Sequence, residues 1–436
     1  MKKLIYALII SLISNFSFAQ NLYFPPLTGT TWDTISPANL GWCQPKIDSL
    51  YDFLEQTNSK SFIVLKDGKI VLEKYFGTHG RDSLWYWASA GKTLTAFTVG
   101  IAQQEGFLSL SDTSSTYLGT GWTVCPPNKE NKITIRNQLT MTSGLNDGVP
   151  DHYCTIDTCL QYLADAGTRW AYHNGPYTLL DGVISNATGQ SLNSYFNAKI
   201  KNRIGMNGTF FQVGYNNVYF SNSRSMARFG LLMLNEGNWN GTQIMTDTTY
   251  FNQMVNTSQN LNLSYGYLWW LNGKNSFMAP TFQTIFPGSL MPDAPNDLYA
   301  ALGKDGQIIN VVPSQNLVLM RMGEAPGTSA DVTPAYNNDI WNYMNDLSCN
   351  VNANQINNNS NLNIYPNPAK DKLYIQNDFN LSRLCLFNSN GQKILDLNGI
   401  NTNQLSLNLD NYPSGLYFLK IEINGQQSIH KFFKGG

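Results

Sequence analysis

An asparagine-rich segment near residue 350 divides this chain of 436 residues into two parts with different patterns. Eight of the fourteen residues from 350 to 363 are asparagine, a composition typical of a linker. The residues before it mix helical and strand periodicity. Those after it show short strand patterns, such as 373–375 and 384–387, separated by turn signals such as Asn390-Gly391 and Asn424-Gly425. The sequence therefore predicts a large domain at 44–349, a linker at 350–361 and a small C-terminal β-sandwich at 362–436.

Residues 1–19 have the pattern of a secretory signal peptide. Lys2 and Lys3 precede an apolar stretch that ends in the small-residue cleavage site Ser17-Phe18-Ala19. A retained membrane anchor is the alternative, but the apolar stretch is short for a spanning helix and no lipid-accepting cysteine follows it. We expect an exported protein whose mature chain begins at Gln20, with a leader at 20–43 and no transmembrane span.

The composition excludes some classes of function. A net charge of −1 and only 13% charged residues argue against binding to nucleic acid, which requires a basic face. Six cysteines in an exported chain can pair, and Cys154 and Cys159 flank a short loop, which makes them the best candidates. Cys125 and Cys385 have no evident partners. No spacing of cysteine and histidine resembles a zinc site, so we expect neither a metal nor another cofactor.

The large domain alternates between two kinds of pattern. Residues 46–55 have helical periodicity, and two alternating strands at 61–66 and 69–76 flank the turn Asp67-Gly68. A helix is predicted from Ser89 to Gly106, and residues 113–285 are mostly typical of helices and loops. Strand patterns return at 300–302, 307–312 and 317–322, before a closing helix at 335–347. Helices inserted into an antiparallel sheet with flanking terminal helices indicate an α+β fold.

Three short motifs follow one another along the large domain: Ser89-Ala-Gly-Lys92, Tyr172-His-Asn174 and Lys304-Asp-Gly306. Each motif alone is weak evidence of function, because such short patterns occur by chance. The tripeptide Lys66-Asp67-Gly68 of this chain, for example, has the pattern of a plain hairpin turn. Ser89 and Lys92 are three residues apart on a predicted helix, so they share a face. Lys92 can take the serine proton if burial or cationic neighbours lower its pKa. The pattern favours acyl transfer through a covalent acyl-serine.

The other motif residues would complete such a site. Tyr172 between two ammonium groups can act as a base or proton shuttle, and the Asn174 amide can donate to a substrate carbonyl. Lys304 can stabilise negative charge, Gly306 would let substrate approach the next strand, and the backbone N–H groups of Ser89 and Gln307 would form an oxyanion hole. The alternatives without a catalytic role are a helix N-cap for Ser89, aromatic packing for Tyr172 and a plain hairpin turn for the third motif. We interpret His173 as structural.

Several stretches around these motifs resemble the serine β-lactamase and penicillin-binding-protein superfamily, above all its class C-like hydrolases and esterases. They are residues 87–112, 133–145, 170–180, 223–241, 265–270 and 303–323. The resemblance implies that Ser89 is the nucleophile, that Lys92 and Tyr172 are the base system, and that Asn174 and Lys304 bind substrate. It also implies an antiparallel sheet with terminal helices plus an all-α part at about 113–285. Since terminal helices lie side by side in that fold, Cys43 would come near Cys349.

One residue departs from the β-lactam-processing pattern. Asp305 stands where those relatives usually have a hydroxyl that binds a substrate carboxylate, and like-charge repulsion would disfavour such substrates. We therefore expect an exported serine hydrolase acting on carboxylic esters or non-standard amides. The alternatives are a penicillin-recognising D,D-peptidase or β-lactamase and, from another class, a catalytically inactive surface-binding module.

The C-terminal part has a resemblance of its own. The stretches IYPNPAKDKLYI (364–375), LFNSNGQKIL (386–395) and YPSGLYFLKI (412–421) are similar to the C-terminal sorting domain of the type IX secretion system. This resemblance implies a chain exported through the periplasm of a Gram-negative bacterium, with the type IX machinery as partner, and delivered to the cell surface or the medium. A carbohydrate-binding β-sandwich is the alternative.

Overall fold

The computed structural model describes residues 22–327, 332, 334–349, 362–389, 392–423 and 426–435. The predicted signal peptide, the linker at 350–361 and the predicted turns Asn390-Gly391 and Asn424-Gly425 lie outside these residues. The chain forms two compact units, one up to Ser348 and one from Cys349. Within the described ranges, no helix combines the length and apolar character needed to cross a bilayer. No three metal-ligating side chains gather there into a possible metal site.

A six-stranded antiparallel sheet forms the centre of the first unit, in the order β2-β1-β13-β12-β11-β8. The predicted hairpin at its edge is confirmed, because Asp67 and Gly68 have φ angles of 51° and 80°, as a two-residue turn of this kind requires. The bounds of the strands are β1 Ser59–Lys66, β2 Lys69–Tyr75, β8 Trp270–Leu271, β11 Tyr299–Gly303, β12 Gln307–Val312 and β13 Leu317–Gly323.

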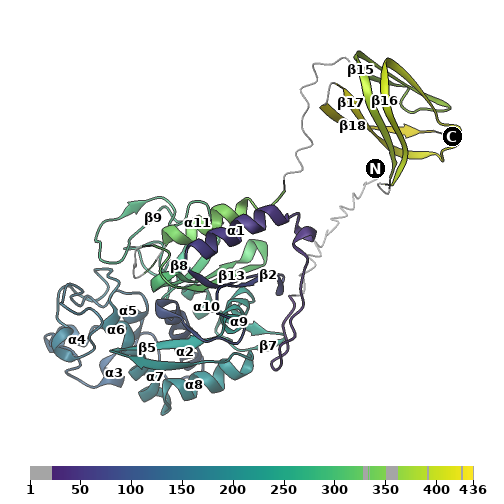
Figure 1. Cartoon of the computed structure of the whole chain (residues 1–436). Coiled ribbons are helices and arrows are strands. Elements are labelled where there is room, and N and C mark those ends of the chain that lie inside the picture. The colour runs from purple at the N-terminus through teal and green to yellow at the C-terminus, as the bar shows by residue number, and fades with distance from the viewer. Residues whose placement is uncertain are drawn as a thin grey trace, which may run out of the picture. The chain divides into compact units, whose positions relative to one another are not determined.

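Helices cover both faces of this sheet (Figure 1). The terminal helices α1 (Gln44–Gln56) and α11 (Pro334–Asn345) lie side by side, and the Phe53 ring stacks on Tyr343 with centroids 4.5 Å apart. On the other face, α9 (Ser223–Leu234) approaches β13 closely. A Cβ at Gly230 would lie 2.5 Å from Val318 Cγ1, so a glycine is needed for this contact. The predicted α+β architecture is confirmed.

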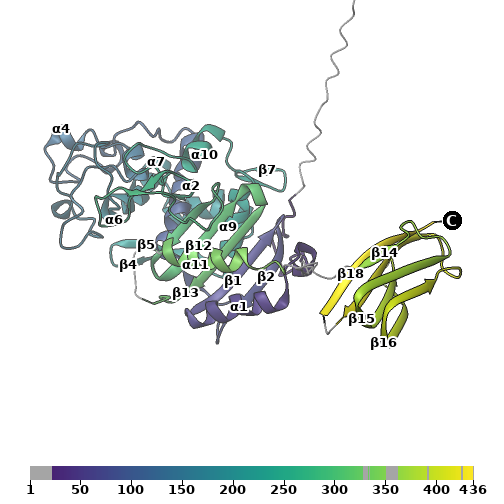
Figure 2. The ribbon, with the colours of Figure 1, turned by 90° about the horizontal axis from the view of Figure 1, so that it is seen from above.

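The inserted helical part lies beside the sheet (Figure 2). The helix predicted from Ser89 to Gly106 is shorter in the structure: Ser89 lies in a 3₁₀ turn at Ala88–Gly91, and the α-helix runs from Lys92 to Gln104. The helices are α2 Lys92–Gln104, α3 Ser115–Leu118, α4 Pro127–Glu130, α5 Ile135–Leu139, α6 Asn174–Thr178, α7 Leu180–Thr188, α8 Leu192–Lys199 and α10 Thr248–Met254.

Residues 113–285 also contain strands that the sequence analysis did not predict. The largest addition is a hairpin of β4 (Thr209–Val213) and β5 (Asn216–Ser221), which pairs with β3 (Trp85–Tyr86) in a three-stranded sheet. Two smaller hairpins are formed by β6 (Asn238–Trp239) with β7 (Thr242–Gln243), and by β9 (Ser276–Phe277) with β10 (Phe286–Pro287). The first of these hairpins matters for the candidate site.

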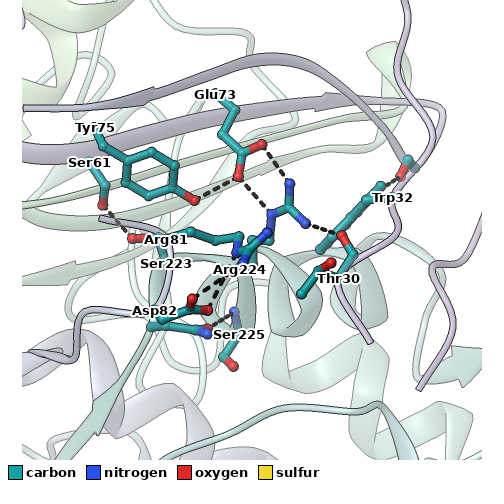
Figure 3. Close-up of polar contacts among 12 residues, drawn as sticks. Thr30, Trp32, Ser61, Glu73, Tyr75, Arg81, Asp82, Ser223, Arg224 and Ser225 are labelled. Carbon is teal, nitrogen blue, oxygen red and sulfur yellow. Dashed lines mark hydrogen bonds and ion pairs between the residues drawn. The ribbon is translucent and has the colours of Figure 1, made fainter. Parts of the chain in front are cut away.

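Two arginines of α9, Arg224 and Arg228, hold the leader against the rest of the unit, and Figure 3 shows the contacts of Arg224. Arg224 pairs with Glu73 through two hydrogen bonds of 2.7 Å and also donates to the carbonyl of Thr30. Arg228 donates to the carbonyl of Pro26 at 2.6 Å, and its guanidinium lies 5.2 Å from the Trp32 ring centroid. The leader is therefore an ordered part of the unit from residue 22 onwards.

The disulfides agree with the expectations. Cys154 and Cys159 are bonded to each other, with Cα atoms 5.9 Å apart. Cys43 and Cys349 are each disulfide-bonded, and since Cys125 and Cys385 are free thiols, these two form the second bridge. The pairing expected from the side-by-side terminal helices is confirmed.

The second unit is all β and has its own hydrophobic core. Its antiparallel strands are β14 Asn363–Tyr365, β15 Lys372–Asn388, β16 Lys393–Asn408, β17 Gly415–Ile423 and β18 Gln426–Lys434. The predicted short strands at 373–375 and 384–387 both lie on β15. That strand continues through a break in its pairing register between Gln376 and Leu381, which the sequence pattern presented as a loop.

Candidate active site

Ser89 lies in the turn Ala88–Gly91, directly before the first residue of α2. The Nζ atom of Lys92 donates a hydrogen bond of 2.8 Å to the Ser89 Oγ, so the predicted contact between these side chains is present. Lys92 is buried, with 4% of its surface exposed. Ala88 has a φ angle of 46°, a left-handed conformation that costs free energy for any residue except glycine. No sequence pattern predicts a strained residue at this position.

Two aromatic rings surround the Lys92 ammonium group. Its Nζ lies 5.2 Å from the ring centroid of Tyr172 and 4.4 Å from that of Tyr177. Such cation–π contacts stabilise a buried cation. Tyr172 is held in turn by Trp270 of β8, with ring centroids 5.7 Å apart. Burial raises the pKa of Tyr177 well above its usual range, so this second tyrosine, which the sequence analysis missed, remains protonated.

Asn174 begins α6 and is almost fully buried, with 1% of its surface exposed. Neither atom of its amide group has a hydrogen-bond partner among the described residues. Buried polar groups are nearly always paired, so an unpaired one calls for a partner such as water or a ligand. The expected binding of a substrate carbonyl by this amide stays a prediction.

A cavity of about 440 Å³ joins these residues. Ser89, Lys92, Asn174 and Lys304 are all part of its wall, so the three motifs meet at one place. Tyr172 is not part of the wall and contacts Lys92 from outside it. The remaining lining residues are Tyr86, Ala88, Tyr153, Tyr177, Val213, Asn216, Asn217, Val218 and Phe220.

The third motif forms the turn between β11 and β12, and Lys304 alone of its three residues lines the cavity. Lys304 is exposed and lines the cavity. The Asp305 carboxylate accepts a hydrogen bond of 2.7 Å from the Tyr86 hydroxyl, and Asp305 itself is not part of the cavity wall. This geometry gives no support to a direct repulsion between Asp305 and a substrate carboxylate, which stays a prediction. Burial and the Asp305 charge raise the pKa of Tyr86.

Gly306 and Gln307 are not part of the cavity wall either. A Cβ at Gly306 would lie 2.8 Å from Arg321 Nη1 and 3.2 Å from the Tyr336 ring, so these neighbours, rather than an approaching substrate, explain the glycine. The Gln307 side chain is buried and donates to the Gly323 carbonyl at 2.6 Å. Only its backbone N–H therefore remains as a possible oxyanion donor.

Gly303, which the sequence analysis did not single out, allows the third motif to lie next to Ser89. A Cβ at this position would lie 2.6 Å from the Trp87 carbonyl oxygen and 3.1 Å from the Ser89 nitrogen. The end of β11 can pass this close to Ser89 only because the residue is glycine. Its place directly before Lys304 was the available signal.

Comparison with known proteins agrees with this geometry. Residues 52–339 match the model of the Beta-lactamase family. The chain belongs to that family. Residues 363–434 match the model of the secretion system C-terminal sorting domain, which implies secretion or delivery to the cell surface. The beta-lactamase-family domain is therefore followed by a sorting domain, as the two resemblances indicated.

Individual relatives of the beta-lactamase-family domain are distant. An uncharacterised protein of Alkalihalophilus pseudofirmus is 25% identical over 311 residues, covering 62% of this chain and 84% of the relative. A protein of Bacillus anthracis described as a 6-aminohexanoate-dimer hydrolase has a TM-score of 0.55 at 20% identity, covering 74% of this chain and 90% of its own. A family VIII carboxylesterase has a TM-score of 0.53 at 15% identity, covering 70% and 99%. These solved structures share the fold.

His173 lies outside the cavity wall of this family domain and precedes α6. It is buried, and burial lowers its pKa to about 4, so it is neutral at physiological pH. These observations support the interpretation that His173 is structural.

Asp181 on α7 is a buried carboxylate that the sequence analysis missed. One of its oxygens accepts a hydrogen bond of 2.6 Å from Asn217, a residue of the cavity wall. The other oxygen, Oδ1, has no partner among the residues described. Burial raises the pKa of Asp181 to about 7, although the Asn217 hydrogen bond and the charge of Lys92 act in the opposite direction.

The substitution Asp181→Asn should stabilise the domain at alkaline pH. The folded state binds the Asp181 proton more tightly than the unfolded state, whose pKa is about 4. Folding stability should therefore fall as the pH rises from about 4 to about 7, and the full cost, on the order of 4 kcal/mol, remains above that range. Urea denaturation at pH 4 and pH 8 measures it, and the stabilisation by Asp181→Asn should be largest at pH 8. The exposed Asp339→Asn is the control, and an equal effect of Asp181→Asn at both pH values would contradict the expectation.

Proposed function

We propose that this protein is an exported serine hydrolase that forms an acyl-Ser89 intermediate on carboxylic esters or non-standard amides. The observation that carries the proposal is the 2.8 Å hydrogen bond between Lys92 and Ser89 on the wall of a cavity. The wall also contains Asn174, whose amide has no partner among the residues that the structure describes. A serine hydroxyl is a weak nucleophile without an adjacent base, and a buried lysine is a suitable one.

In the proposed reaction, Lys92 and Tyr172 together take the proton of Ser89 while its Oγ attacks the substrate carbonyl carbon. The backbone N–H groups of Ser89 and Gln307 bind the resulting oxyanion, and Lys304 adds positive charge. The Asn174 amide orients the substrate. The tetrahedral intermediate then expels an alcohol or amine, which receives the proton, and an attacking water releases the acid by the same steps.

The proposed reaction allows either an alcohol or an amine as the leaving group. Structures with this fold include proteins described as a 6-aminohexanoate-dimer hydrolase and a family VIII carboxylesterase. A D,D-peptidase or β-lactamase remains the alternative, and an inactive binding module is the alternative of another class. The engagement of Asp305 by Tyr86 removes one argument against carboxylate substrates, so the preference for neutral ones is supported by the apolar part of the wall instead.

Covalent labelling and two substrate types test this proposal. A fluorophosphonate should label the wild-type protein at Ser89, as peptide mapping would determine, and p-nitrophenyl esters should be hydrolysed much faster than nitrocefin. Preferential nitrocefin hydrolysis would favour the β-lactamase alternative. Failure of both labelling and turnover in folded protein would favour the binding module.

We further propose that residues 362–436 direct the chain to the type IX secretion machinery. A chain that ends at Cys349 retains the bridge to Cys43 and all of the described first unit. We expect it to be an active hydrolase that no longer reaches the cell surface or the medium. Cell fractionation with an ester assay measures this, and a chain with the tail restored after an unrelated linker is the control. Normal surface delivery of the truncated chain would contradict the sorting role.

A further inference from the structure

The β4–β5 hairpin presents an apolar face on the side of the candidate site. Phe211 pairs with Val218, and Phe220 pairs with Thr209, and directly opposite residues of an antiparallel pair share a face. Val213 lies two residues beyond Phe211, so it is on the same face. Thr209 and Asn216 lie on this face too, since they stand opposite Phe220 and Val213. We call its four apolar residues, Phe211, Val213, Val218 and Phe220, the open face. Phe211 and Val213 are each 52% exposed.

The opposite face of the same hairpin already supplies its packing. Phe210 and Tyr219 are buried there, with ring centroids 4.8 Å apart, and Phe196 of α8 lies 5.4 Å and 5.3 Å from them. The hairpin therefore does not need the open face for its attachment to the domain. Contiguous apolar surface that folding leaves exposed marks a binding site more often than a random surface does.

The open face is continuous with the cavity that contains Ser89. Val213, Val218 and Phe220 line that cavity together with Ser89 and Lys92. Tyr86 of β3 pairs with Phe220, and their ring centroids are 6.2 Å apart. Phe211 packs edge-on against Phe220 at 5.6 Å and extends the apolar surface beyond the cavity wall. The open face therefore extends from the cavity that contains Ser89 to the exposed ring of Phe211.

The charged residues of the cavity wall do not belong to the open face. They are Lys92 and Lys304, which belong to the first and third motifs, whereas the four residues of the open face are all uncharged. A substrate whose carbonyl lies at Ser89 and Asn174 would thus place the group beside its scissile bond on an apolar surface. A charged group would lose its hydration there without gaining a partner.

We propose that the open face is the subsite for an uncharged alkyl or aryl group that the substrate carries next to its ester or amide bond. This inference rests on the proposed function, since it concerns the same cavity. Each methylene that leaves water for the open face should strengthen transition-state binding, so kcat/KM should rise about two- to fourfold per methylene.

Two ester series test the subsite. One lengthens the acyl group of p-nitrophenyl esters from acetyl to octanoyl, and the other lengthens the alcohol of acetate esters from ethyl to octyl. A rise in one series supports the proposal and identifies the side of the scissile bond that the open face binds. Flat or falling kcat/KM in both series would overturn it.

The variant Val213→Asp places a charge on the open face at an exposed position, where folding should tolerate it. The ratio of kcat/KM for the long-chain and short-chain ester should fall at least tenfold. Val124→Asp is the matched control, because Val124 is 51% exposed and is not part of the cavity wall, and it should keep the wild-type ratio. An unchanged ratio in Val213→Asp would overturn the assignment.

A binding measurement separates the subsite from the chemistry. On a Ser89→Ala background, calorimetry should show octan-1-ol binding at least tenfold more tightly than butan-1-ol, and adding Val213→Asp should remove the difference. If fluorophosphonate labels Ser89 but neither chain-length effect appears, the subsite is wrong and the proposed function stands. If labelling fails while octan-1-ol binds and Val213→Asp abolishes that binding, the subsite stands and the proposed function is wrong.

Discussion

Ser89→Ala is expected to reduce kcat for p-nitrophenyl esters by ~10⁴–10⁶ and to abolish fluorophosphonate labelling. Removing the Oγ atom removes the only group that could form the acyl bond in the proposed reaction. It also removes the acceptor of the 2.8 Å hydrogen bond from Lys92. Steady-state kinetics with a stopped-flow search for a burst of p-nitrophenol measure the effect.

The fold should survive this change, because alanine fits wherever serine does in the turn Ala88–Gly91. Thermal unfolding and circular dichroism of the variant should therefore match the wild type closely. Ser111→Ala, at an exposed serine, is the control and should keep full activity. Activity of Ser89→Ala within tenfold of the wild type would reject Ser89 as the nucleophile.

The second large effect concerns Lys92 and Tyr172, which should behave as one proton-transfer unit. Lys92→Ala and Tyr172→Phe should each lose about 10³-fold or more in kcat, and the double variant should lose little beyond the more damaging single change. The physical reason is their contact, since the Lys92 ammonium lies 5.2 Å from the Tyr172 ring. Once one member of a shared proton path is missing, the other has no proton to pass on.

A double-mutant cycle on kcat and kcat/KM measures this coupling. Tyr177→Phe distinguishes the ring from the hydroxyl, because Tyr177 also places its ring near Lys92, at 4.4 Å, but has a raised pKa. It should lose far less activity than Tyr172→Phe. Losses that multiply in the double variant would mean that Lys92 and Tyr172 act independently.

The parts of the site that the sequence predicted well are those with local geometry. Ser89 and Lys92 are three residues apart on one turn, so their contact follows from the backbone alone. Asp67-Gly68 fixes its hairpin because both residues tolerate positive φ. The terminal helices and the bridge between Cys43 and Cys349 followed from resemblance to a whole fold, and no spacing along the chain would have predicted that pairing.

The parts that the sequence did not predict depend on contacts between distant segments. Aromatic residues lie on both faces of β4–β5, with Phe210 on one and Phe211 on the other, so the alternation that identifies a half-buried strand is interrupted in TFFQV at 209–213. The direction of the Asp305 carboxylate depends on Tyr86, which is 219 residues away in the chain. Asp181 and Gly303 gain their roles only from neighbours, Asn217 in one case and the Ser89 backbone in the other.

The hydrogen bonds that hold the leader determine which of its residues can be substituted. Arg224 and Arg228 grip the main-chain carbonyls of Thr30 and Pro26, and the Tyr23 N–H donates to the carbonyl of Asp67. Main-chain groups are the same in every residue, so substitutions between 22 and 31 leave these bonds available. Two aromatic side chains also hold the leader: the Phe24 ring lies 5.0 Å from that of Trp239, and the Trp32 indole N–H donates to the Gly68 carbonyl. The leader between these two aromatic residues can therefore vary in sequence while its main chain stays bound to the domain.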